Sequence, residues 1–314
     1  MDAKKLAIVF RRHSIYLRGM ADYRKISLPI FTSLTFAGSF IAGKYAIYEL
    51  PPLTITLIRY IIAFLFLSLF IFKYKTTSLK VSARDHILMA ILGLTGVIGY
   101  HFFFYIALRY TAIANTAIIN AFGPVVIGIA AAVFLKERLR LSNYIGILIS
   151  LAGVMLLITK GHLSILTGMD FNRGDLLMFC AVLSWTVYAL ITKKLIQRYS
   201  GFAITFYSAM WGVIILLPLS LFENAYQQVL TLSATAIYSI LYMGIVASAI
   251  GYLLYNLSIE QIGPTRTSSF VYSLVPIFVS FLALVFFDEP ITLVTISSTV
   301  LIILGLRFML KEKT

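Results

Sequence analysis

Long apolar stretches, separated by short polar ones, follow each other along almost the whole chain. Ten of them approach or exceed the roughly 20 residues that an α-helix needs to cross a bilayer. They lie at about 28–48, 53–72, 87–108, 112–134, 142–159, 175–193, 202–222, 235–258, 265–287 and 292–310. They are too long for the strands of a membrane barrel, which have about 10 residues of strict alternation. The pattern therefore predicts an all-α integral membrane protein with ten transmembrane helices.

One part of this pattern occurs twice. Residues 99–158 fall on residues 251–310 without a gap when the chain is moved forward by 152 positions. Identical residues then coincide, among them Gly99 with Gly251, Tyr100 with Tyr252, Pro124 with Pro276, Glu137 with Glu289 and Gly153 with Gly305. Self-similarity at a fixed distance indicates a duplicated unit. We expect a basic cytoplasmic tail at 1–27 and two five-helix repeats, at 28–160 and 174–310.

The loop charges predict how these helices are oriented. Cytoplasmic loops of membrane proteins carry an excess of lysine and arginine. With the N-terminus inside, only Arg109, Lys160 and Arg173 of the loop cations fall outside, so both termini are expected in the cytoplasm. Because five is an odd number, the second repeat crosses the membrane in the opposite sense to the first. Inverted repeats of this kind are typical of secondary transporters, whose halves expose a central site to each side in turn.

Composition supports a lipid environment. The 314 residues are 60% hydrophobic and 12% charged, and the mean hydropathy is +0.94. The net charge of +14 is placed mainly between the apolar stretches, so we expect a multi-pass protein of the cytoplasmic membrane and no nucleic-acid partner. With Cys180 as the single cysteine, the sequence offers no disulfide framework and no thiolate metal cluster. We expect no metal and no cofactor.

An ordered set of segments resembles a known family. It comprises 38-GSFIAGK-44, Pro51-Pro52 with Arg59, 137-ERLRLSNYIGILISLAGV-154, 184-SWTVYALITKK-194 and 289-EPITLVTISSTVLIILG-305. With these segments the chain resembles, over about residues 28–310, a ten-helix member of the drug/metabolite transporter superfamily, EamA type. The resemblance implies two five-helix bundles around a central cavity, lined mainly by the first, third, fourth, sixth, eighth and ninth helices. It also implies a metabolite carrier, often an exporter of amino acids or related compounds.

Polar side chains inside the predicted helices are the candidates for a substrate cavity, because such residues usually face the protein interior. Several recur at helical spacing, as Trp185, Tyr188 and Thr192 do. The candidates are Ser39, Lys44, His101, Tyr105, Thr116, Asn120, Trp185, Tyr188, Tyr252, Asn256, Ser268 and Tyr272. Their hydroxyl, amide and aromatic groups suit a zwitterionic or neutral, partly aromatic solute better than a polyanion. The alternative is that the serine, threonine and asparagine side chains join helix to helix.

Four residues have two interpretations each. Lys44 and Arg59 could hold a substrate carboxylate, but they lie only about 6–9 Å from a helix end. Long side chains can reach the membrane surface over that distance, or form a structural pair. His101 could relay protons or be a hydrogen-bonded packing residue among aromatic rings. Glu137 is expected to cap the helix that follows it rather than to act as a gate.

Transport without proton coupling is the function that the sequence favours. No aspartate or glutamate lies in the middle of a predicted helix, where proton-coupled carriers usually keep one. We expect no enzyme, but an exporter or facilitator of small organic metabolites driven by the substrate gradient. The alternatives are an intramembrane enzyme acting on lipid, which would need a clustered nucleophile, base or metal, and a non-transporting scaffold. The small residues Gly146, Ser150 and Gly153 could join helices within one protomer or support a homodimer.

Overall fold

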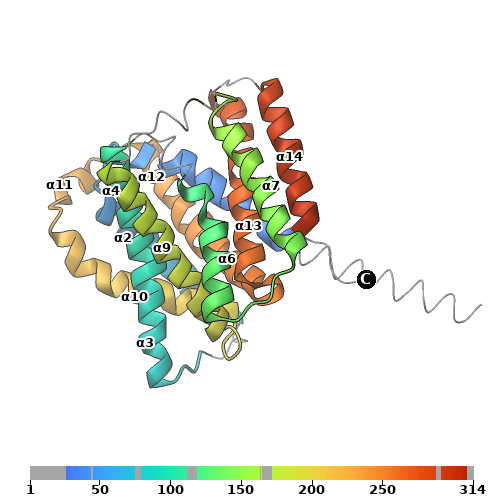
Figure 1. Ribbon diagram of the computed structural model, residues 1–314. Helices are drawn as coiled ribbons and strands as arrows, with labels where there is room; N and C mark the ends of the chain where they lie inside the picture. Colours follow the sequence, from blue (N-terminus) through green and yellow to red (C-terminus); the bar gives the residue numbers. More distant parts are fainter. Residues whose placement is uncertain are drawn as a thin grey trace, which may run out of the picture.

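The computed structural model is a bundle of helices that pack side by side (Figure 1). It describes residues 26–43, 45–74, 79–111, 119–162, 164, 172–287 and 291–309. Within these ranges there is no strand, and seven helices are long and apolar enough to cross a membrane. Two shorter apolar helices span Ile119–Phe134 and Leu293–Phe308. The prediction of an all-α membrane protein is therefore confirmed. Residues 1–25 of the expected tail, Lys44, Thr116 and Glu289 lie outside the described ranges.

The helices follow the predicted apolar stretches. The first candidate span is Ile26–Gly43. It is followed by α2 (Pro52–Tyr74), α3 (Ala83–Leu92), η1 (Gly93–Gly99), α4 (Tyr100–Tyr110), α6 (Gly123–Phe134) and α7 (Leu141–Ile158). The chain continues with α9 (Arg173–Leu195), α10 (Gly201–Leu221), α11 (Tyr226–Leu230), α12 (Ala234–Tyr242), η2 (Met243–Gly251), α13 (Tyr252–Phe287) and α14 (Leu293–Met309). We refer to residues 26–162 as the first half and to residues 172–309 as the second half.

Two helices that the sequence predicts separately follow each other directly within α13, with a non-helical residue between them. The candidate span Ala234–Leu282 contains the expected stretch 235–258 and most of the expected stretch 265–287. They are joined within α13 at Gly263, whose φ of 82° and ψ of 165° are not helical. A positive φ is accessible to glycine because it has no Cβ. The Gly263-Pro264 sequence therefore marks the break between the two helices, as predicted, and the hydroxyls of Ser258 and Thr267 on either side of it lie 3.0 Å apart.

Several helices begin after a serine or asparagine, which are residue types that commonly cap helix N-termini. The side chains of Ser82, Asn172, Ser200 and Ser233 each accept a hydrogen bond from a backbone N–H of the following first turn. Glu137 does not act in this way, because α7 begins only at Leu141 after Arg140. The Glu137 carboxylate instead accepts a hydrogen bond of 2.9 Å from the Thr265 hydroxyl on α13. The expectation that Glu137 caps the next helix is therefore wrong.

Two π-helical turns, η1 and η2, lie at corresponding places in the two halves. They end at Gly99 and Gly251, two residues that coincide in the 152-residue shift. A Cβ on Gly93 of η1 would lie 2.7 Å from the backbone nitrogen of Gly212 in α10. A Cβ on Gly244 of η2 would lie 2.9 Å from the carbonyl oxygen of Arg59 in α2. Each π turn thus packs its backbone closely against a helix, and π turns occur often at functional sites.

The pair α7 and α14, side by side in Figure 1, is joined by small residues at matching positions. The Ser150 hydroxyl donates a hydrogen bond of 3.3 Å to the carbonyl oxygen of Ile302, which is 152 residues further along the chain. A Cβ on Gly305 would lie 2.7 Å from the carbonyl oxygen of Gly146. Small residues let helix backbones approach this closely in membranes. The small-residue face therefore serves contact within the protomer, and a homodimer stays a prediction that needs another surface.

Carboxylates join the two halves where helices begin. Glu223, just after α10, accepts hydrogen bonds from the backbone N–H groups of Leu53 (2.9 Å) and Thr54 (2.7 Å) in the first turn of α2. Glu49 accepts a hydrogen bond of 2.8 Å from the backbone N–H of Ser233, which caps α12. A negative charge is stabilised at a helix N-terminus because the unpaired N–H groups and the helix dipole both favour it.

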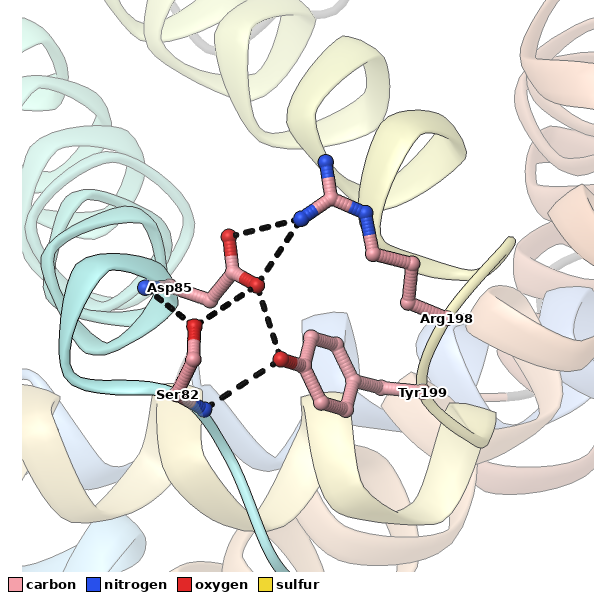
Figure 2. Close-up of polar contacts among 4 residues, drawn as sticks. All are labelled: Ser82, Asp85, Arg198 and Tyr199. Atoms are coloured by element: carbon pink, nitrogen blue, oxygen red, sulfur yellow. Dashed lines mark hydrogen bonds and ion pairs between the residues drawn. The ribbon is translucent and has the colours of Figure 1, made fainter.

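A second junction between the halves surrounds Asp85 at the start of α3. Figure 2 shows that its carboxylate faces Arg198 and Tyr199, in the turn that follows α9. The carboxylate accepts hydrogen bonds from the Tyr199 hydroxyl (2.7 Å), the Ser82 hydroxyl (3.0 Å) and Nη1 of Arg198 (3.0 Å). Asp85 is nearly buried whereas the Arg198 side chain is 55% exposed. Because surface ion pairs add little, the tyrosine and serine bonds carry much of the stabilisation.

The two carboxylates Glu137 and Glu49 are in opposite electrostatic situations. Burial beside α13 raises the pKa of Glu137, although the Thr265 hydrogen bond and the charges of Lys193 and Arg266 act against this. Hydrogen bonds from Ser233 lower the pKa of the exposed Glu49. A raised pKa means that the folded protein favours the protonated Glu137, whereas it favours the ionised Glu49.

The close contact of α7 and α14 leads to a packing prediction. We expect Gly305→Leu to lower the free energy of unfolding by about 1–3 kcal/mol, because the new side chain would overlap Gly146 and Ser150. Ser297→Leu, on the exposed side of α14, is the matched control and should change little. Thermal unfolding in detergent measures both variants, and equal melting temperatures for the two would contradict the packing described.

The raised pKa of Glu137 predicts a pH dependence of stability. The stability linked to a raised pKa is complete below the ordinary value of 4.5 and is lost as pH rises through the folded-state pKa. We therefore expect the melting temperature of the wild type, relative to Glu137→Gln, to fall as pH rises from about 4.5.

Glu49→Gln is the control with the opposite sign. The stabilisation from Glu49 should be present above pH 4.5 and should be lost as pH falls. Melting curves between about pH 4 and pH 8 test both variants. If the melting temperature of the wild type relative to Glu137→Gln rose with pH, as is expected for Glu49, burial would not be the dominant influence on the pKa of Glu137.

Candidate functional site

The centre of the bundle contains four of the predicted cavity residues in direct contact. Trp185 and Tyr188 on α9 stack with ring centroids 5.2 Å apart, and the Trp185 ring meets Tyr252 of α13 edge to face at 5.3 Å. The Tyr188 hydroxyl donates to Oδ1 of Asn256 (3.0 Å), whose Nδ2 donates to the Thr205 hydroxyl on α10 (2.9 Å). All of these side chains are buried. The prediction that Trp185 and Tyr188 share one inward face is confirmed.

Residues from the first half complete this group. The Tyr252 hydroxyl donates a hydrogen bond of 2.9 Å to the carbonyl oxygen of Gly96 in the π turn η1. Phe36, from the first span, lies with its ring centroid 5.8 Å from that of Tyr252 and 6.2 Å from that of Trp185. The indole N–H of Trp185 donates to the Tyr255 hydroxyl at 2.9 Å. We call Phe36, Tyr60, Tyr100, Trp185, Tyr188, Tyr252, Tyr255 and Asn256 the central cluster.

His101 and Tyr105 lie beside this cluster. Nδ1 of His101 is 2.8 Å from the carbonyl oxygen of Val97, four residues earlier in the chain. The His101 ring lies edge-on to Tyr60 at 5.8 Å and is 6.1 Å from the ring of Tyr105. His101 and Tyr105 are both buried. This geometry matches the interpretation of His101 as a hydrogen-bonded packing residue.

Arg59 does not reach the membrane surface. Its side chain on α2 is only 3% exposed, and its Nε donates a hydrogen bond of 2.9 Å to the Ser248 hydroxyl in the π turn η2. The guanidinium carbon is 5.6 Å from the centre of the Tyr60 ring, within the range of a cation–π contact. Of the two structural interpretations of Arg59, snorkelling is therefore wrong, whereas a structural pair is present, with Ser248.

The remaining cavity candidates lie apart from these contacts. The Tyr272 ring packs against Gly123, where an added Cβ would be 3.2 Å away, and it lines a small pocket with Ala121 and Pro124. The Ser268 hydroxyl donates to the carbonyl oxygen of Thr265 in its own helix. The buried Oδ1 of Asn120 has no hydrogen-bond partner among the described residues. Ser39 is half-buried on the first span, and Lys44 and Thr116 lie outside the described ranges.

Sequence reasoning did not place Tyr60 and Tyr255 in the cavity list. Both are fully buried, and the Tyr60 hydroxyl has no hydrogen-bond partner among the described residues. A signal for Tyr255 was present, since it follows Tyr252 by three residues and shares its helix face. Tyr60 gave only the weaker signal of an aromatic residue next to the lone arginine of an apolar stretch.

The arrangement is chemically suited to binding. The rings of the central cluster offer apolar and edge-to-face contacts for an aromatic or aliphatic group. Asn256 and Tyr188 supply hydrogen-bonding groups within the cluster, and Arg59 supplies them at its border. Ligand sites are commonly built in this way, from apolar and aromatic walls with a few placed polar groups.

Comparison with known proteins agrees with this architecture. A sequence profile described as the EamA-like transporter family matches residues 24–159 and again residues 172–311. The "Uncharacterized transporter YyaM" of Bacillus subtilis is 27% identical over 283 residues, which cover 89% of this chain and 90% of that protein. A crystal structure with 18% identity covers 92% of this chain and 96% of its own, with a TM-score of 0.75, and shows the fold alone.

Two further relatives have more specific names. A "Probable amino-acid metabolite efflux pump" of Salmonella typhimurium is 25% identical over 292 residues, covering 89% of this chain and 92% of that protein. A "Probable terminal-alkyne amino-acid exporter" of Streptantibioticus cattleyicolor is 26% identical over 197 residues, covering 62% and 63%. Because the family profile matches most of the chain, this multi-pass membrane protein belongs to the EamA-like transporter family.

Proposed function

We propose that the protein is a secondary-type transporter, an exporter or facilitator, of small organic metabolites. Ten transmembrane helices would form two inverted repeats, at 28–160 and 174–310, after a basic tail at 1–27, with both termini in the cytoplasm. The repeats would expose the central cluster to each side of the membrane in turn. The observation that carries this proposal is that both halves contribute to the central cluster, through Phe36 and Tyr60 on one side and Trp185 and Tyr252 on the other.

The repeated features of the structure support the inverted arrangement. The π turns η1 and η2 end at matching glycines, and η1 packs against α10 as η2 packs against α2. The hydrogen bond from Ser150 to Ile302 joins residues at matching positions. A contact between equivalent residues is expected where a pseudo-two-fold axis passes between two repeats.

Bonds at the helix ends support alternating access. Glu49 and Glu223 join the halves near the starts of α12 and α2, whereas Asp85 joins them at the start of α3. In the predicted orientation the first two lie on the outer side and Asp85 lies on the cytoplasmic side. Access from the outer side would then require the bonds of Glu49 and Glu223 to break while those of Asp85 remain, and access from the cytoplasm would require the opposite. Rocking of the two halves against each other would have this effect.

The substrate class that we propose is amino acids or related, partly aromatic metabolites. The aromatic side chains of the central cluster and its few polar groups suit such solutes. The printed names of the two relatives from Salmonella typhimurium and Streptantibioticus cattleyicolor point to amino-acid compounds as well. No carboxylate of the described residues belongs to the central cluster, so we propose that the substrate gradient drives transport.

Transport by the purified protein in vesicles tests the proposal. Labelled amino acids and aromatic metabolites are offered without an ion or pH gradient, and we expect saturable flux of one solute class. Tyr188→Phe removes the hydroxyl that bonds Asn256 and should raise KM by about two- to tenfold, since one hydrogen bond contributes about 0.5–1.5 kcal/mol.

Tyr238→Phe is the matched control, because Tyr238 is 72% exposed, and it should behave as the wild type. Flux that appears only when a proton gradient is imposed would overturn the gradient-driven mechanism. The absence of flux for every solute under every gradient would count against a transporter.

A further inference from the structure

An arginine with no acidic partner among the described residues borders the central cluster. Arg59 is 97% buried, about seven residues or roughly 10 Å into α2. An arginine side chain keeps its positive charge in proteins and has five N–H donors. The structure gives a close acceptor only to Nε, through Ser248, while Nη1 has the Met243 sulfur at 4.0 Å.

The acidic residues in the described part of the chain are engaged elsewhere. Five of them accept hydrogen bonds from other residues: Glu49 from Ser233, Asp85 from Arg198, Glu137 from Thr265, Asp175 from Thr111 and Glu223 from Thr54. The sixth, Glu260, is exposed. None of them forms an ion pair with Arg59. A buried charge without a counter-charge costs several kcal/mol, so a protein that keeps one inside its membrane domain is expected to use it.

A second unpaired group lies next to this charge. The Tyr60 hydroxyl is buried and has no partner among the described residues, and the Arg59 guanidinium lies 5.6 Å from the centre of the same ring. The Tyr60 ring in turn meets Tyr252 edge to face at 5.8 Å. A cation without an acidic partner among the described residues and a hydroxyl without a close hydrogen-bond partner among them thus lie beside an aromatic surface.

We propose that Arg59 and Tyr60 bind the carboxylate of a small organic acid, whose apolar or aromatic part packs against the central cluster. This rests on the proposed function and specifies its substrate class. A carboxylate matches the fork of a guanidinium and accepts two parallel hydrogen bonds. A phosphate dianion would require more positive charge than the single guanidinium supplies. The ligand would also neutralise Arg59, which explains why an arginine is tolerated at this depth.

A binding assay tests this without requiring transport. The chain has two tryptophans, and Trp185 lies in the central cluster, so Trp211→Phe leaves one fluorescent reporter at the site. The probes are matched pairs: benzoate with benzamide, indole-3-acetate with indole-3-acetamide, and L-phenylalanine with L-phenylalaninamide. Phenyl phosphate is added as an unpaired probe that represents phosphate anions.

We expect at least one carboxylate to bind the wild-type site about tenfold or more tightly than its amide, as a charge-assisted hydrogen bond implies. Arg59→Gln should remove this preference, Arg59→Lys should reduce it, and Tyr60→Phe should weaken carboxylate binding several-fold while leaving amide binding unchanged. Arg109→Gln, which alters an exposed arginine at the end of α4, should have no effect. Gel filtration and melting curves establish that each variant is folded. If Arg59→Gln does not fold, Arg59→Lys, which keeps the positive charge, is the variant on which the test is made.

The proposal is wrong if no carboxylate is preferred over its amide, or if the preference survives in folded Arg59→Gln. Tighter binding of phenyl phosphate than of benzoate would overturn the carboxylate assignment. The proposed function fails separately: carboxylates that bind through Arg59 but do not cross vesicle membranes would leave this inference standing. Conversely, flux of neutral solutes that does not depend on Arg59 would support the proposed function and contradict this inference.

Discussion

Polar groups inside the bilayer must be satisfied by the protein itself, and this requirement governs how the centre of the molecule is built. Lipid offers no hydrogen bonds, so an unpaired polar group costs several kcal/mol. The structure meets the requirement by pairing side chains between helices that are distant in sequence, as in the chain from Tyr188 through Asn256 to Thr205. The Tyr252 hydroxyl is satisfied by a backbone carbonyl of η1. Among the described residues, six buried side-chain atoms have no hydrogen-bond partner, on His86, Thr192, Trp211, Ser298, Tyr60 and Asn120. Of these residues, Tyr60 is the one next to the buried Arg59.

The same requirement explains the role of the π turns. Glycines at Gly93 and Gly244 let these turns lie directly against α10 and α2, which brings the Ser248 hydroxyl to Arg59 and the Gly96 carbonyl to Tyr252. Both bonds connect a π turn with a side chain of the other half. The backbone irregularities thus lie where the two halves meet at the central cluster, and they hold its polar members in place.

Much of this organisation could be predicted from the sequence, because the apolar stretches and the helical spacing are local signals. The membrane-spanning character and the shared inward face of Trp185 and Tyr188 follow from such signals. Long-range contacts were harder to predict. Glu137 appeared to be a helix cap because its neighbours in the chain suggested one, whereas its partner Thr265 lies on α13. The burial of Arg59 depends on the approach of η2, which no periodicity encodes. Gly263-Pro264, by contrast, is a local signal, and the structure has a non-helical residue at that position.

Accessibility of the central site from both sides tests the account most directly. Ser248→Cys, in a chain whose single cysteine is replaced by Cys180→Ala, puts a thiol of similar size beside Arg59. A membrane-impermeant thiol reagent is added from the cytoplasmic side or from the outer side of oriented vesicles. Alternating access predicts labelling from either side, slowed by a bound solute. Labelling from only one side, or from neither, would contradict a central site that two halves expose in turn.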